Sequence, residues 1–163
     1  METTEIRKIY DALERNVLIL IAIPIPIFAF AYLHAQEGTL DWDLPHLPAF
    51  WDSFFLGFVF VILALHYVRF HNGIKQAMTG GFDLEEKVRR YAVATMQRFW
   101  VLFFAGFICA FGLMWFDNAG YTIAFAITLV FSSLGKPTPD RIIRLLRLKG
   151  EEREEIEQLK RRL

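Results

Sequence analysis

The sequence predicts an all-α integral membrane protein with four transmembrane helices in two antiparallel hairpins. Four apolar segments, residues 17–34, 50–68, 99–116 and 119–134, approach the length that a helix needs to cross a hydrocarbon core of about 30 Å. All 18 Lys and Arg residues lie outside these segments. The chain is 55% hydrophobic and 16% aromatic, which exceeds the composition of an ordinary soluble domain.

The charged residues predict the orientation of the chain. The two segments expected to emerge on the far side, 35–49 and 117–118, contain no Lys or Arg. The other thirteen acids and all eighteen bases give the near side a net charge of +5. Because Lys and Arg beside spans are retained in the cytoplasm, we expect both termini to be cytoplasmic. The small size and compact loops favour a prokaryotic source, and therefore the bacterial inner membrane. The five far-side acids are Glu37, Asp41, Asp43, Asp52 and Asp117.

Amphipathic cytoplasmic helices are expected at the N-terminus, before span three and at the C-terminus. Residues 2–16 carry apolar side chains at helical spacing. The cytoplasmic loop 69–98 contains two helix breakers, Asn72–Gly73 and Gly80–Gly81. It then offers Asp83 as an N-cap, from which one helix should run without interruption to residue 116.

The segment 136–163 is expected to be a cytoplasmic helical tail, separate from a transmembrane domain at 1–135. Thr138 as N-cap and Pro139 as the first helical residue should begin a helix that Gly150 ends. Its arginines alternate with leucines, as in helices of the headgroup layer. Docking on residues 83–98 is the alternative.

Span one contains two prolines near its middle, Pro24 and Pro26. Each removes a backbone N–H, so the carbonyls of Leu20 and Ala22 lose their intrahelical partners. In lipid these carbonyls need another donor or a local change of helix type, and a kink is expected. A fixed kink that shapes packing is favoured over a mobile hinge that lines a cavity.

Small residues along spans three and four predict a close contact between them. In lipid, small side chains let two backbones approach, and dispersion then drives the packing. The tight turn at 117–120 makes these spans antiparallel neighbours. Span two offers a weaker pair, Ser53 and Gly57, for a homo-oligomer. The expected packing face comprises Gly106, Ala110, Gly120, Ala124, Thr128 and Ser132.

Aromatic residues near the span ends are expected to form two interfacial belts. The single cysteine, Cys109, lies in the middle of span three and predicts a buried packing role, since it has no partner for an intramolecular disulfide. The belts comprise Trp42, Trp51, Trp115 and Tyr121 on the far side, and Tyr10, Tyr67 and Trp100 on the near side.

The candidate binding residues gather at the inner ends of the spans. His66, Arg69 and His71 are close in the sequence, and Arg98 lies across the loop at the start of span three. Their positive charge and hydrogen-bond donors suit an anion or a lipid headgroup. Interfacial anchoring is the simpler interpretation.

Other chemistry is weakly supported. His46 with Glu37, Asp41 and Asp43 could bind a divalent metal, but a solvated acidic loop is favoured and no metal is expected. Spans three and four contain no histidine for a haem between paired helices, and no cofactor is expected. No catalytic motif of the GxGxxG, Walker, HExxH or GxSxG type occurs. No charged residue lies deep in a span, which argues against an ion-coupled carrier.

These observations favour a non-enzymatic multi-pass membrane protein, an accessory or structural subunit that acts by helix packing. The expected partners are membrane lipids and either further copies of the chain or another membrane protein, not nucleic acid. One alternative is a small oligomeric channel or transporter with a Pro-kinked first helix. The other is a lipid- or anion-binding protein, or an enzyme, that uses the basic residues at the inner ends of the spans.

Overall fold

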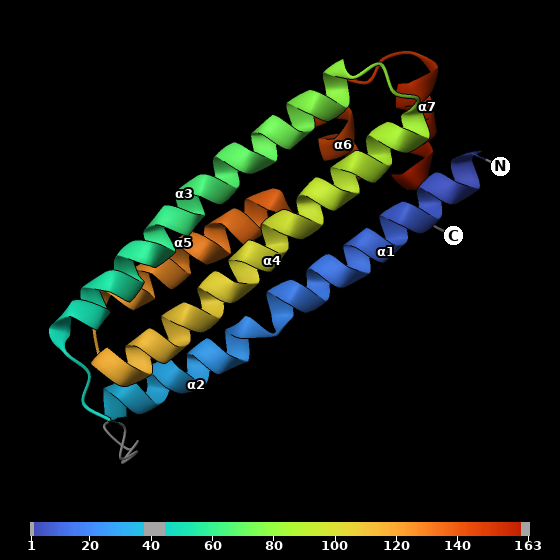
Figure 1. The fold of residues 1–163 in the computed structure, drawn as a ribbon. Helices are drawn as coiled ribbons and strands as arrows, with labels where there is room; N and C mark the ends of the chain where they lie inside the picture. Colours follow the sequence, from blue (N-terminus) through green and yellow to red (C-terminus); the bar gives the residue numbers. More distant parts are fainter. Residues whose placement is uncertain (1, 38–44, 161–163) are drawn as a thin grey trace. The chain divides into compact units, whose positions relative to one another are not determined.

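The computed structural model describes residues 2–37 and 45–160. Within these ranges the chain is helical and contains no strand, which confirms the all-α class (Figure 1). The elements are α1 (Glu2–Ala22), α2 (Pro24–Glu37), α3 (Ala49–Thr79), α4 (Leu84–Phe116), α5 (Gly120–Gly135), α6 (Pro139–Leu146), α7 (Glu151–Glu157) and the 3-10 helix η1 (Gln158–Lys160).

Three helical stretches are long and apolar enough to cross a membrane. They are Thr4–Ala35, Ala49–Thr79 and Leu84–Phe116, and they contain the first three expected spans. The fourth expected span corresponds to α5, an apolar helix of 16 residues. At 1.5 Å per residue α5 is about 24 Å long, somewhat short of a hydrocarbon core of about 30 Å.

The chain divides into two compact units. Unit 1 comprises Met1–Leu18, Tyr67–Arg98 and Gly135–Leu163, and unit 2 comprises Ile19–His66 and Phe99–Leu134. Each of α1, α3 and α4 contributes residues to both units, and α5 lies in unit 2 except for its last residue, Gly135, which belongs to unit 1. The tail at 136–163 therefore groups with the N-terminal helix and the loop segment in unit 1.

Unit 1 has its own apolar core. On α1 the buried side chains recur every three or four residues, which places them on one helix face. Polar contacts join the tail to other helices: the Arg7 guanidinium donates to the Gln158 carbonyl at 3.0 Å, and Lys87 Nζ lies 3.4 Å from Glu152 Oε2. The tail thus docks on protein in unit 1. The buried set includes Ile6, Tyr10, Leu13, Val17, Ile74, Val88, Ile142, Leu146 and Ile156.

The expected long helix before and through span three is present. The Asp83 carboxylate accepts a hydrogen bond from the Glu86 N–H at 2.9 Å, which confirms the N-cap. The prediction that Asn72–Gly73 breaks α3 was wrong. A Cβ on Gly73 would lie 3.6 Å from the Ala94 Cβ, so α3 packs against α4 at this position. This packing outweighs the loss of about 1 kcal/mol of helix stability that one glycine causes relative to alanine. The helix ends at Thr79 instead.

The helix after Thr138 begins as expected and ends early. The Thr138 hydroxyl accepts from the Arg141 N–H at 3.1 Å, and Pro139 is the first residue of α6. The helix ends at Leu146, not at Gly150, because Arg147 adopts a left-handed conformation with φ 52°. The Leu148 N–H then donates to the Ile143 carbonyl at 3.0 Å, and the Leu148 side chain is buried.

Candidate functional site

The proline pair interrupts the first long apolar stretch in unit 2. α1 ends at Ala22 and α2 begins at Pro24, with Ile23 in a turn between them. Pro24 is buried, and its Cβ would lie 3.0 Å from a Cβ on Gly106 of α4. Pro26 is exposed. The close contact at Pro24 suits a fixed kink, and the mobility of the break stays a prediction.

The expected packing face lies inside unit 2. Ala110, Ala124, Thr128 and Ser132 are all at most 6% exposed. The Thr128 and Ser132 hydroxyls donate to backbone carbonyls four residues earlier, at 2.8 and 2.9 Å, so these polar groups are satisfied within α5. The two glycines of the face lie close to neighbouring helices. A Cβ on Gly106 would contact the side chains of Pro24 and Phe125, and a Cβ on Gly120 would contact the side chain of Leu56.

A polar network joins the start of α3 to the turn between α4 and α5. The Asn118 side-chain amide donates to both carboxylate oxygens of Asp52, at 3.1 and 3.2 Å. The Tyr121 hydroxyl donates to the Asp52 carbonyl at 2.9 Å. The Asn118 side-chain oxygen also accepts from the Gly120 N–H at 2.9 Å, which helps to begin α5. Asp52 is therefore held through both its carboxylate and its backbone carbonyl.

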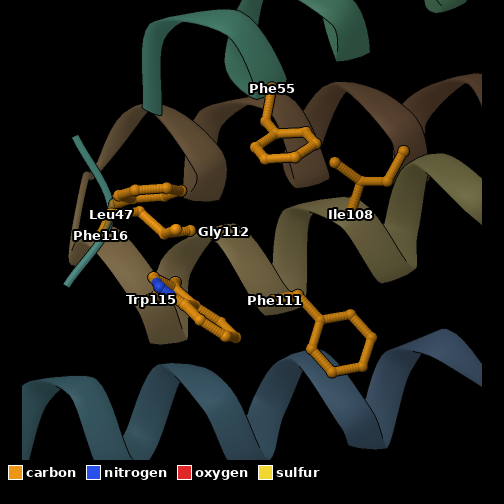
Figure 2. Close-up of a pocket in the computed structure, with 7 residues that line it drawn as sticks. All are labelled: Leu47, Phe55, Ile108, Phe111, Gly112, Trp115 and Phe116. Carbon is orange, nitrogen blue, oxygen red and sulfur yellow. The ribbon is translucent and has the colours of Figure 1, made fainter. Parts of the chain in front are cut away.

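An apolar cavity of about 380 Å³ lies beside this network (Figure 2). Phe55 of α3 and Ile108 of α4 line one part of it, and Leu47, from the segment before α3, lines another. The Trp115 indole N–H donates to the Pro45 carbonyl at 3.0 Å, which fixes the indole in the wall. The lining comprises Leu47, Phe55, Ile108, Phe111, Gly112, Trp115 and Phe116.

A basic cluster forms in unit 1 around the Phe70 ring. The guanidinium carbons of Arg98 and Arg141 lie 4.9 and 5.9 Å from the ring centroid. Arg98 and Phe70 are buried, and the His71 imidazole packs edge-on against Phe70 and Tyr67. Burial, and then the charges of Arg98 and Arg141, lower the pKa of His71. The imidazole is therefore neutral at pH 7, and the two arginines carry the positive charge.

Two residues of α4 add hydroxyl groups to this cluster. The side chains of Tyr91 and Thr95 are both fully buried. Burial raises the pKa of Tyr91, and the nearby charge of Arg141 partly opposes that shift. The cluster therefore combines two cations with neutral hydroxyls, a set of groups that can donate hydrogen bonds to an anion.

Arg98 also contacts the end of α5. A Cβ on Gly135 would lie 2.9 Å from both the Cζ and the Nε of Arg98. The guanidinium therefore sits at the last residue of α5, where backbone carbonyls lack intrahelical donors and a cation is stabilising. This contact gives Arg98 a structural role of its own.

The structure brings together two of the four predicted binding residues, His71 and Arg98. Arg69 is exposed. His66 belongs to unit 2, where its ring packs edge-on against Phe131 with 5.0 Å between centroids. Arg141 is not among the residues that the sequence predicts for this site, because it lies in the tail, far along the chain from Arg98. The N-cap at Thr138 fixes the register of α6, but only the fold shows that Arg141 faces Phe70.

The remaining sequence predictions have mixed outcomes. Cys109 is buried, as expected. Trp51, Trp115, Tyr67 and Trp100 are exposed, whereas Tyr121 and Tyr10 are buried, so their rings do not face outward; the two belts stay a prediction. Trp42 lies outside the described residues, as do Asp41 and Asp43 of the considered metal site. Among the residues that the structure describes, no group of three His, Cys, Asp or Glu side chains could hold a metal ion.

Comparisons with models of protein families, with curated proteins and with solved structures found no match.

Proposed function

We propose that the chain is a non-enzymatic, multi-pass membrane protein that serves as an accessory or structural subunit by packing its helices against a partner. In this proposal α5 is the fourth span, the spans form two antiparallel hairpins, and both termini are on the cytoplasmic side of a bacterial inner membrane. The partner is a second copy of the chain or another membrane protein.

The observation that carries the proposal is the open face of α3. Of the most apolar 18-residue stretch of α3, 22% is buried inside the protein. The corresponding share for α4 is 44%. Ser53, Gly57 and Ala64 lie near one side of α3 and are exposed, and a Cβ on Gly57 would meet nothing within 4 Å. Small residues on a lipid-facing helix permit close approach of a second helix. The other small-residue face, on α4 and α5, is already buried inside unit 2.

Replacement of Gly57 by leucine is expected to reduce association at least fivefold, because the larger side chain would hold a partner helix away. The measurement is the mass of the detergent-solubilised particle from the native membrane, with identification of whatever co-purifies. Ala126→Leu is the matched control, since Ala126 is an exposed position on α5. A wild-type particle of one chain, or equal association in Gly57→Leu, would contradict the proposal.

A second candidate function is the binding of an anionic lipid headgroup by the basic cluster. The convergence of Arg98 and Arg141 on Phe70 favours it, because guanidinium groups bind phosphate through several directed hydrogen bonds. The same purification distinguishes the two functions. Anionic lipid that co-purifies with a single chain, and that is lost in Arg141→Gln, would support headgroup binding instead of an accessory role.

A further inference from the structure

The apolar cavity of unit 2 continues into a second recess of different character. The recess has a volume of about 330 Å³ and shares Leu47, Trp115 and Phe116 with the apolar cavity. It adds His46 and Asp52, so polar groups line it as well as apolar ones. The two volumes together form one site with an apolar part and a polar part.

The apolar part selects hydrocarbon. Its walls are aromatic and aliphatic side chains, and the one polar side-chain group among them, the Trp115 indole N–H, is already bonded to the Pro45 carbonyl. A polar occupant would lose its hydrogen bonds to water there and gain none in return. A volume of about 380 Å³ falls within the usual range for small-molecule sites.

The polar part presents an acceptor and a donor. Both oxygens of Asp52 accept from Asn118, which holds the carboxylate in one position while leaving lone pairs on each oxygen. A carboxylate is the natural partner of an ammonium group. The exposed imidazole of His46 can donate to a phosphate oxygen. These two groups are complementary to a zwitterion.

We infer that this site binds a zwitterionic phospholipid with an ammonium headgroup. One acyl chain occupies the cavity lined by Phe55, Ile108 and Phe111, and the headgroup lies at Asp52 and His46. A phospholipid joins an apolar acyl chain to a polar headgroup, just as the site joins an apolar cavity to a polar recess. The site lies beside apolar helices able to cross a membrane, where such lipids are the surrounding solvent. It is distinct from the α3 face, which the proposed association uses.

The test uses the full chain in lipid nanodiscs with a phosphatidylethanolamine that carries a photoreactive diazirine on one acyl chain. We expect crosslinks to map to Phe55 and to residues 108–116. Unlabelled phosphatidylethanolamine should compete at least fivefold better than phosphatidylglycerol, whose headgroup is anionic. Asp52→Asn, which keeps the shape of the side chain and removes its charge, should abolish that preference.

Filling the cavity gives an independent test. Ile108→Trp should reduce crosslinking at least fivefold, whereas Ile123→Trp, the same change at an exposed position of α5, should leave it within twofold. The lipid competition experiment uses only the wild-type protein. It therefore tests the site even if Ile108→Trp fails to fold. Wild-type crosslinks that miss the cavity, or that Ile108→Trp leaves intact, would overturn the site. Equal competition by the two lipids would overturn the headgroup assignment.

Discussion

Replacement of Gly112 by alanine is expected to lower the free energy of unfolding by about 1–3 kcal/mol, although alanine is the better helix former by about 1 kcal/mol. A Cβ at residue 112 would clash with three ring atoms of Tyr121, namely Cε1, Cζ and Cδ1. The ring is fully buried, and its hydroxyl donates to the Asp52 carbonyl at 2.9 Å, so it cannot move aside without losing that bond. Chemical unfolding in detergent measures the change.

Gly57→Ala is the matched control for this prediction. Gly57 is also a helical glycine in unit 2, but a Cβ there would meet nothing within 4 Å. The control should therefore be neutral or stabilising by up to about 1 kcal/mol, from helix propensity alone. Equal losses of stability in the two variants would show that α5 does not pack on α4 through Tyr121.

Replacement of Phe70 by alanine is expected to cost about 3–5 kcal/mol of unfolding free energy, the usual range for a buried phenylalanine. The ring is 3% exposed and contacts the guanidinium groups of Arg98 and Arg141. Its loss leaves a cavity and removes two cation–π contacts. The two like-charged guanidinium groups would then lie near each other without the ring that both contact. Unfolding followed by circular dichroism in detergent provides the measurement.

Phe58→Ala on the same helix is the control for Phe70. Phe58 is 44% exposed, so its truncation should cost well under half as much. If both variants lose the same stability, the assignment of the two faces of α3 is wrong. A selective loss in Phe70→Ala supports the basic cluster as a packed structural unit, whatever it binds.

The sequence predicts those elements whose cause is local. Asp83 as N-cap, Thr138 with Pro139, and the long apolar stretches all depend on residues within a few positions of one another. The failures have a tertiary cause. Gly73 stays helical because α4 packs beside it, and Arg147 ends α6 because Leu148 is buried against the core of unit 1.

The candidate sites show the same distinction. Clustering of basic residues near span ends pointed to His71 and Arg98, which the fold brings together. Arg141 lies on α6, more than forty residues after Arg98 in the sequence, and no sequence periodicity relates it to Phe70. Asp52 and Asn118 are 66 residues apart, so their hydrogen bonds, and the two-part cavity beside them, had no signal in the sequence.

In the proposed topology the chain crosses the membrane four times, with α5 as the last span and both ends on one side. Single cysteines at Lys8, Ala119 and Glu154, all exposed, in a Cys109→Ser background report the side of each segment. In right-side-out membrane vesicles, a membrane-impermeant thiol reagent should label Ala119→Cys at once, and label Lys8→Cys and Glu154→Cys only after permeabilisation. Labelling of Glu154→Cys but not Lys8→Cys in sealed vesicles would place the ends on opposite sides and contradict the four-span account.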